Sequence, residues 1–528
     1  MGFRWNPLVV AAALAVFPAM AQASDSHYGD ALLYIDASTD TLHDMGLDVW
    51  THRSTQRGAM VRVTPQQMAT LDATGWSYTI VDPDLGTRLD AEATRLAGGP
   101  GPLPGGLPAN YHDDYRDFDT TLDRIAAIAA AESERTTIVE VGTSLEGRPI
   151  RGLSITNPGP ADRPVILVQG TQHAREWIST AASIYAAEQY ASASSGGYLD
   201  NQLDQVVLVV VPVVNPDGYT FSWEDERLWR KNRRDGIGVD LNRNWGVAWG
   251  GDGASDEPEA PNYHGPNAFS EPETVAMRDF INADPNMIAL LDVHSFGQLL
   301  LYPWGYGFDN PPADALYVDL AQDMSDAMFQ VDSTWYQPIQ SSELYPAAGN
   351  VIDWTYGVHG LHSITIELRP GPGEEPGFLL GPEDIVPTGD ELVAAIAQVI
   401  DSSLVLGPGT PGDSDGGDGP GPGDDDGTTG DPGGDETTST SGEPGDSTGG
   451  GQGATTSGGG EESGTEPPPT PPAGTAGSDD DSGSSGGDEA GVGTDPGGCG
   501  CTTSGRDSGL GWGLLLLAVG SLRRRRRA

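Results

Sequence analysis

The chain has 528 residues, too many for one ordinary domain, and its 77 acidic and 27 basic residues give a formal net charge of −50. This charge disfavours nucleic acid as a partner, because phosphate groups would be repelled. The two cysteines, Cys499 and Cys501, both lie near the C-terminus, which excludes a disulfide or a thiol active site elsewhere in the chain.

Residues 1–23 have the pattern of a secretory signal peptide. Arg4 precedes an apolar run from Leu8 to Met20, and small residues around position 21 fit a cleavage site. The alternative is a membrane anchor, but the run contains Pro18 and is shorter than the roughly 20 apolar residues needed to span a bilayer. We therefore expect a secreted protein.

Residues 24–97 are expected to form a small α+β domain, followed by a Gly- and Pro-rich linker over 98–110. About 70 residues bury only a marginal core, so the stability of this domain should depend on packing against the neighbouring domain. The expected strands cover 31–35, 60–64 and 76–81, and the expected helices lie near 40 and over 65–73.

Residues 111–406 alternate amphipathic helices with continuous apolar strands, which predicts an α/β domain. Because apolar strands bury both sides, we expect a mixed, mostly parallel central sheet with helices on both faces. The expected strands are 165–168, 206–214, 288–294 and 363–368, and the expected helices are 117–131, 177–191, 273–283 and 390–402.

Residues 407–498 contain 20 acidic residues and no Lys or Arg, and are rich in Gly, Ser, Thr, Pro and Asp. This composition predicts a disordered spacer. Loose Ca²⁺ binding by the Asp-rich stretch 413–418 is a weaker alternative.

Residues 499–528 combine the two cysteines, an apolar run from Leu510 to Leu522 and five consecutive arginines. As a helix that run reaches about 20 Å, less than the roughly 30 Å of a bilayer core. The layout resembles the C-terminal sorting tails of myxobacterial surface proteins. The resemblance implies anchoring to the membrane at the outer cell surface, through Cys499 or Cys501.

Candidate metal ligands follow two of the expected strands. His173 and Glu176 come after the strand 165–168, and an H-x-x-E spacing lets both side chains reach one cation, although alone it is more often an exposed helical pair. His294 ends another strand, and a His₂Glu set with one open position suits a catalytic Zn²⁺. Sites gather at such strand ends.

Glu367 lies at the end of the strand 363–368 among apolar residues. Burying a carboxylate there costs free energy unless it has a functional role or an ion-pair partner. Glu367 is the candidate general base, with an ion pair to Arg369 as the structural alternative. The arginine-rich segments 227–233 and 238–245 offer guanidinium groups to an anionic substrate, or else form a salt-bridged surface.

Together these motifs resemble the zinc carboxypeptidases of the pancreatic carboxypeptidase A/B type along nearly all of residues 111–406. The matching segments are GTSLEGRP from Gly142 to Pro149, His173 to Trp177, Asn215 to Tyr219, Trp229 to Lys231, Asp240 to Trp245, His294-Ser295, Ile352 to Trp354 and Thr365 to Arg369.

The resemblance implies one Zn²⁺ on His173, Glu176 and His294, with Glu367 as general base toward a zinc-activated water. It further implies that Arg230 stabilises the oxyanion and that Asp240 orients a zinc histidine. The residues implied in substrate binding are Arg175 and Arg227 beside the cleft and Asn242, Arg243 and Tyr345 around the terminal carboxylate.

Ile352 stands where the family sets its specificity, so the resemblance implies a preference for hydrophobic or aromatic C-terminal residues; Glu343 and His362 are polar residues that would broaden it. Phe296 replaces a tyrosine common in the family. Residues 24–97 occupy the place of the family's inhibitory pro-segment, which makes the chain a candidate zymogen with activating protease cuts at Arg88 or Arg95. A stable folding domain that does not inhibit is the alternative.

The expected function is therefore a surface-anchored zinc carboxypeptidase acting on peptides and proteins with a free C-terminus. Two alternatives stay open. One is a carboxypeptidase acting on peptidoglycan stem peptides. The other is a non-catalytic surface binding module on the same fold.

Overall fold

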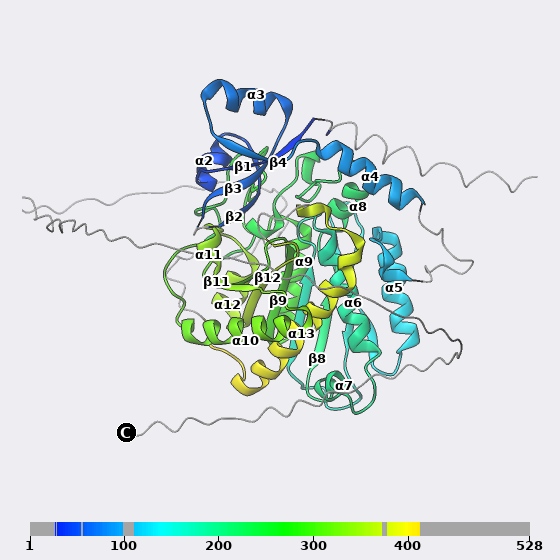
Figure 1. The fold of residues 1–528 in the computed structure, drawn as a ribbon. Helices are drawn as coiled ribbons and strands as arrows, with labels where there is room; N and C mark the ends of the chain where they lie inside the picture. The colour runs from blue at the N-terminus through cyan, green and yellow to red at the C-terminus, as the bar shows by residue number, and fades with distance from the viewer. Residues whose placement is uncertain (1–26, 28, 54–55, 99–109, 372–376, 412–528) are drawn as a thin grey trace, which may run out of the picture. The chain divides into compact units, whose positions relative to one another are not determined.

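The computed structural model describes residues 27, 29–53, 56–98, 110–371 and 377–411, and all of them belong to one compact unit (Figure 1). The expected signal peptide, the sorting tail, almost all of the linker and all but the first five residues of the acidic spacer lie outside these residues. Within the described part of the chain, no helix is long and apolar enough to cross a membrane.

The N-terminal segment forms a four-stranded antiparallel sheet in the order β2-β3-β1-β4. The expected elements are present, and β2 and α4 are additional. The elements are β1 (Ala31–Ile35), α2 (Thr39–Asp44), β2 (Asp48–Arg53), β3 (Gln56–Val63), α3 (Pro65–Thr74), β4 (Tyr78–Asp82) and α4 (Leu85–Gly98).

Local signals fix the ends of α3. The side chain of Thr64 accepts a hydrogen bond from the backbone N–H of Gln67, and the side chain of Gln67 accepts one from the backbone N–H of Thr64. These two hydrogen bonds form a capping box at the start of the helix. The helix ends where Gly75 adopts φ +80°, a conformation that favours glycine.

The larger region is built on an eight-stranded sheet in the order β11-β10-β12-β9-β7-β8-β6-β5. Four of its seven strand pairs are parallel, which confirms a mixed, mostly parallel sheet. Its strands are β5 (Thr136–Thr143), β6 (Pro149–Ile155), β7 (Val165–Gly170), β8 (Val207–Val211), β9 (Met287–Ser295), β10 (Leu299–Tyr302), β11 (Gln337–Gln340) and β12 (His362–Leu368).

Helices cover both faces of this sheet (Figure 1). On β7, Ile166 and Val168 belong to one core cluster, and Val165 and Leu167 belong to another, as expected for side chains that alternate across a strand. The first cluster includes residues of α5 (Phe118–Ala131), α6 (Trp177–Ala191), α10 (Asp314–Asp332) and α13 (Ile385–Leu406), and the second includes residues of α9 (Pro272–Ala283) and α12 (Val351–His359).

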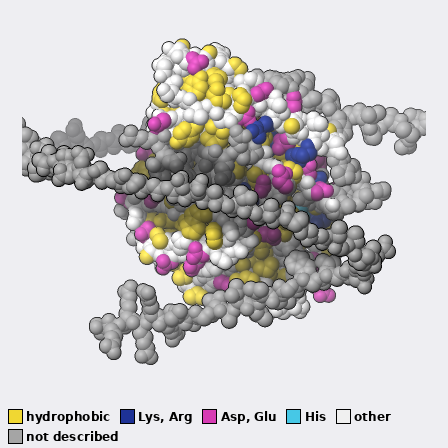
Figure 2. Space-filling model, viewed as in Figure 1, with side chains coloured by type: hydrophobic (Ala, Val, Ile, Leu, Met, Phe, Trp, Pro, Cys, Tyr) yellow, Lys and Arg dark blue, Asp and Glu magenta, His cyan; other side chains and the backbone are white. Residues whose placement is uncertain are grey.

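Shorter helices complete the fold and connect the strands. They are η1 (Tyr111–Asp113), α7 (Tyr198–Leu203), α8 (Pro216–Glu224), η2 (Arg234–Gly236), η3 (Leu241–Arg243), α11 (Ser341–Leu344), η4 (Gly377–Leu379) and η5 (Pro382–Asp384). Figure 2 shows acidic side chains scattered over the visible face, so the negative charge is not confined to the tail.

Three neighbouring parallel strands, β7, β9 and β12, run in the same direction through the middle of the sheet. Their carboxyl ends therefore meet at one edge, where loops leave side chains available for chemistry. The candidate ligands and the candidate base all come from these ends.

Candidate active site

Two short segments and one strand bring the candidate metal ligands together. His173 lies in the loop that follows β7, and Glu176 is the residue immediately before α6. His294 is the last but one residue of β9, the strand beside β7. All three residues are buried, and each is at most 4 % exposed.

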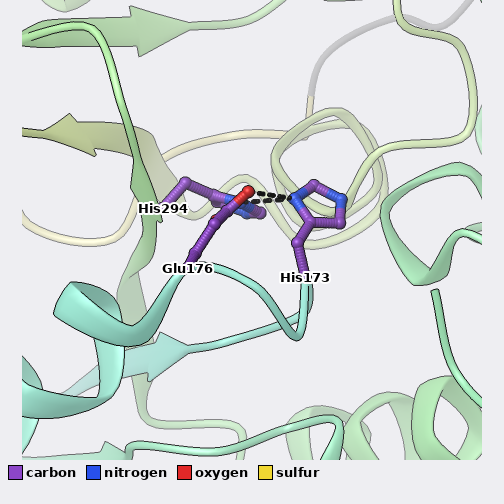
Figure 3. A group of neighbouring side chains, drawn as sticks. All are labelled: His173, Glu176 and His294. Carbon is purple, nitrogen blue, oxygen red and sulfur yellow. Dashed lines mark hydrogen bonds and ion pairs between the residues drawn. The ribbon is translucent and has the colours of Figure 1, made fainter. Parts of the chain in front are cut away.

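The ligand atoms of these side chains converge on one point (Figure 3). Nδ1 of His173 lies 2.9 Å from Oε1 of Glu176, and Nδ1 of His294 lies 3.0 Å from Oε2 of the same carboxylate. The two Nδ1 atoms are 3.0 Å apart. One ligand atom from each residue lies within 4.8 Å of the others, so the group has the compactness a single cation requires.

The donor set fits zinc, because two imidazole nitrogens and one carboxylate oxygen form the His₂Glu type of catalytic zinc site. The far nitrogen of each ring faces a second carboxylate. Nε2 of His173 is 3.0 Å from Oδ1 of Asp240, and Nε2 of His294 is 2.7 Å from Oδ2 of Asp292. A proton on each Nε2 leaves both Nδ1 lone pairs directed at the metal position.

Electrostatics in the group favour a bound cation. Burial alone would raise the pKa of Glu176, but the adjacent His173 and His294 hold it below its usual range. Burial likewise opposes a charge on His294, yet Asp292 and Glu176 raise its pKa well above the ordinary value. Concentrated negative charge around two imidazoles is what a divalent cation neutralises.

Glu367, the candidate base, lies beside this group. It sits opposite His294 in the β12–β9 register, and its buried Oε2 has no hydrogen-bond partner among the described residues. Burial raises the pKa of Glu367 to about 8; a cation nearby favours the ionised form. The alternative pairing with Arg369 is wrong, because Arg369 binds Glu391, Asp332 and Asp384 instead.

Arg230 is tied to the metal group through one carboxylate. Its Nε and one terminal nitrogen donate to Oδ2 of Asp240, at 3.1 and 2.8 Å, while Oδ1 of Asp240 accepts from His173. Burial disfavours its charge, but Asp240 raises the pKa of Arg230 above its ordinary value. Arg230 therefore carries a fixed positive charge beside the ligands, as an oxyanion-stabilising residue requires.

The residues implied in binding a terminal carboxylate lie together. The side-chain oxygen Oδ1 of Asn242 accepts from the backbone N–H of Val351, which places Nδ2 of Asn242 3.4 Å from Nε2 of His294. Arg243 is adjacent and donates to the carbonyl oxygens of Asn242 and Gly253. Its guanidinium carbon lies 5.7 Å from the ring centre of Tyr345, which is half-buried.

Ile352 lies at the start of α12, is 1 % exposed and packs in the second core cluster. Glu343 and His362, the two polar residues expected to broaden the specificity, are on other elements. Glu343 is exposed on α11. His362 begins β12, five residues before Glu367, or about 16 Å along a strand, and contacts Ser403. The expectation that His362 adjusts specificity is therefore wrong.

The two arginines implied beside the cleft are bound by the N-terminal segment. One terminal nitrogen of Arg175 donates to both oxygens of Asp48, each at 3.0 Å. Nε of Arg227 donates to Glu92 at 2.7 Å. Burial opposes ionisation of Asp48, but Arg175 and Arg62 hold its pKa below the ordinary value.

Aromatic side chains extend this contact. Trp50 of β2 packs against Phe296 and Phe378, with ring centres 6.5 and 4.9 Å away. The guanidinium carbon of Arg175 lies 4.2 Å from the centre of the Phe378 ring. Phe296, the residue that replaces a tyrosine, thus belongs to the surface that meets the N-terminal segment.

Asp292 is the site residue that the sequence reasoning missed. A signal for it was available, because Asp292 precedes His294 by two positions in an otherwise apolar strand, and residues i and i+2 of a strand point to the same face. The pairing of Asp48 with Arg175 carried no comparable signal, since 127 residues separate the partners.

Comparisons with known proteins agree with this geometry. The sequence model of the family described as zinc carboxypeptidase matches residues 121–395. Carboxypeptidase B of Astacus astacus is 38 % identical over 299 residues, covering 55 % of this chain and 96 % of that protein. Carboxypeptidase A4 of Mus musculus is 33 % identical over 328 residues, covering 61 % and 77 %.

A solved structure is similar as well. Carboxypeptidase A from Helicoverpa armigera superposes with a TM-score of 0.63 at 28 % sequence identity, covering 72 % of this chain and 99 % of that one. The range matched by the family model contains all the candidate ligands, the candidate base and Arg230.

Proposed function

This chain belongs to the zinc carboxypeptidase family, and on that premise we propose that it is a secreted, surface-anchored enzyme, made with an inhibitory N-terminal segment, that prefers hydrophobic or aromatic C-terminal residues. As a family member it hydrolyses the C-terminal bond of peptides with a free C-terminus. The observation that carries the assignment is the convergence of His173, Glu176 and His294 at neighbouring strand ends.

Each site residue has a task in this reaction. When bound, Zn²⁺ supplies Lewis-acid chemistry that polarises the scissile carbonyl and makes water easier to deprotonate. Glu367 takes that proton, because its buried Oε2 has no partner in the part of the chain that the structure describes and is available to do so. Arg230 stabilises the negative charge that develops on the carbonyl oxygen.

Recognition of a free C-terminus follows from a fixed cluster of donors. Asn242, Arg243 and Tyr345 lie next to the metal group and would bind the terminal carboxylate. Anchoring the substrate at its end sets which peptide bond lies over the metal. Cleavage is therefore expected one residue from the C-terminus.

The proposed preference for hydrophobic or aromatic residues is supported by Ile352, whose aliphatic side chain offers no charge to a basic residue. The names of the relatives do not decide the point, since they include both a carboxypeptidase B and a carboxypeptidase A4. The carboxylate of the adjacent Asp353 is not available to a basic residue of the substrate, because it already accepts hydrogen bonds. The donors are the backbone N–H groups of Gly305 and Tyr306 and the side chain of Asn350.

The proposed inhibitory role of residues 24–97 is supported by two ion pairs. Asp48 and Glu92 bind Arg175 and Arg227, the arginines expected to meet an extended substrate. Arg88 and Arg95, the candidate cut sites, lie within α4. Arg88 pairs with Asp82 and Arg95 with Asp114. A protease would therefore have to act on residues that are first released from a helix.

Secretion and surface anchoring are supported by the sequences of residues 1–23 and 499–528 alone. Fractionation of cells expressing the full chain tests them. The proposal expects the enzyme at the outer surface, released into the medium when Cys499 and Cys501 are both changed to serine. Retention of the intact chain in the cytoplasm would contradict it.

The function is tested on the full chain, with and without limited proteolysis, using N-blocked peptides that end in Phe, Leu, Arg or Glu. We expect chelator-sensitive release of Phe and Leu, restored by zinc and absent in Glu367→Gln. Release of Arg in preference to Phe would overturn the specificity but keep the chemistry. No release by a folded, zinc-loaded, processed protein would overturn the enzyme assignment.

A further inference from the structure

Both candidate metal-binding histidines have a buried carboxylate next to the ring nitrogen that faces away from the metal position: Asp240 for His173 and Asp292 for His294. We propose that Asp292 is a second positioning residue, which accepts a hydrogen bond from Nε2 of His294 and thereby strengthens zinc binding. The inference rests on the assignment of zinc to His173, Glu176 and His294. It adds to that site a residue that acts through a ligand and not on the substrate.

The strand geometry makes this contact rigid. Asp292 and His294 are alternate residues of β9 and share one face of the sheet. Their side chains meet at 2.7 Å, a short distance that suits a charge-assisted hydrogen bond. In the register, Asp292 lies between Gln169 of β7 and Thr365 of β12, so paired strands hold its backbone on both sides.

Amide groups hold the other lone pairs of Asp292. Nε2 of Gln169 donates to Oδ1 at 3.0 Å. Nε2 of Gln172 lies 2.9 Å from Oδ1 and 3.0 Å from Oδ2. The carboxylate therefore has little rotational freedom, and it presents Oδ2 to His294.

The two carboxylates differ in charge balance. Asp240 shares its charge between His173 and Arg230. Asp292 is fully buried, and among the described residues no lysine or arginine forms an ion pair with it. Within the described ranges of the chain, His294 is the only ion-pair partner of the Asp292 carboxylate, so the charge of Asp292 acts mainly on that metal ligand. A buried carboxylate placed in this way makes the imidazole a stronger donor to the metal.

Asp292 has a rival role as a specificity residue, because Nδ2 of Asn242, a residue implied in substrate binding, lies 3.5 Å from its Oδ2. The contacts disfavour this role. Both oxygens already accept hydrogen bonds, and none of the side chain's surface is exposed to receive the basic group of a substrate.

The test compares zinc affinity in full-length wild type, Asp292→Asn and Asp292→Ser by competition with a chelator. Asp217→Asn is the matched control, because Asp217 is equally buried but contacts Ser144 and Arg148, not a metal ligand. We expect the zinc dissociation constant to rise about 10- to 100-fold in both Asp292 variants and to stay unchanged in the control. The Co²⁺-substituted Asp292 variants should show shifted visible absorption bands, and the control should not.

A nitrogen-15 histidine spectrum of the zinc-loaded wild type gives a readout that needs no variant. We expect His294 to carry its proton on Nε2, protected from exchange; a proton on Nδ1 would overturn the proposal. Folded Asp292 variants with unchanged zinc affinity and unchanged Co²⁺ bands would also overturn the proposal. If those variants in addition acquired a preference for Arg, Asp292 would be a specificity residue. A wild-type chain that holds no zinc would overturn both the metal assignment and this inference.

Discussion

Glu367 lies directly opposite His294 in the register of the parallel strands β12 and β9. Neighbouring strands are about 4.8 Å apart, so pairing alone brings the candidate base next to a metal ligand 73 positions earlier in the chain. A slip of one residue would turn Glu367 to the other face of the sheet. The apolar residues that flank it, Ile366 and Leu368, both belong to the first core cluster and hold the register.

Replacing Glu367 by glutamine should abolish catalysis and leave the metal bound. The amide keeps the shape of the side chain but cannot take a proton, so kcat/KM should fall by about 10³-fold. Zinc content, measured by atomic absorption, should stay at one ion per chain, because Glu367 is not one of the converging ligands. Activity within tenfold of wild type would assign the base elsewhere.

Replacing Ile352 by aspartate should change the preferred C-terminal residue from Phe to Arg. A carboxylate at this buried position is costly by itself, so the variant should also unfold at a lower temperature. The measurement is the ratio of kcat/KM for peptides ending in Phe and Arg, expected to change about 100-fold or more. Ile352→Leu is the control and should keep the wild-type preference.

Removing the Asp48 carboxylate should raise the activity of the uncut chain. Asp48→Asn weakens two hydrogen bonds to a buried guanidinium, which are worth about 1.5–3 kcal/mol each when charged. We expect at least about tenfold more activity before proteolysis and no change afterwards. Asp36→Asn, an exposed change on the same segment, should have no effect. Equal latency in both variants would contradict the proposed inhibition.

Alkaline pH should loosen the N-terminal segment through His27. This residue is buried between Asp30 and Glu226, at 2.8 and 2.6 Å, with Arg62 at 3.2 Å. Burial lowers its pKa, but the hydrogen bonds to Asp30 and Glu226 outweigh burial and raise it to about 8. The stabilising contact is thus complete below pH about 6.5 and is lost as pH rises through about 8.

The measurement is the activity of the uncut chain divided by that of the cut enzyme across pH 6 to 9. This ratio removes the pH dependence of catalysis itself. We expect the ratio to rise with pH in the wild type and to be flat in His27→Gln. A ratio in the wild type that falls or stays constant over this range would show that His27 does not hold the segment.

Much of the catalytic region follows from the sequence because its signals are local. His173 follows the apolar run that becomes β7, and His294 and Glu367 lie at the ends of the runs that become β9 and β12. The carboxyl ends of neighbouring parallel strands share one edge. The pattern of these runs therefore predicts that the metal group and the base share one edge of the sheet, and the strand order β12-β9-β7 in the structure brings them close together. Helices on both faces follow from the same runs.

Other parts of the molecule depend on long-range contacts that cannot be predicted from the sequence pattern. The strand β2, Asp48–Arg53, mixes charged and apolar residues, so its β conformation reflects pairing with β3 and not its own pattern. The partners of Asp48 and Glu92 lie more than 120 residues away. Only tertiary structure reveals which carboxylate meets which arginine.

The helix α4 joins two features of the proposed latent enzyme within one turn. Glu92, which binds Arg227, and Arg95, a candidate cut site, are three residues apart. A protease can reach the bond after Arg95 only once that turn has unwound, and the same unwinding withdraws Glu92 from the catalytic region. Recognition by the protease and release of the inhibitor are then a single event, so activity should begin to appear as the bond is cut, without waiting for the segment to diffuse away.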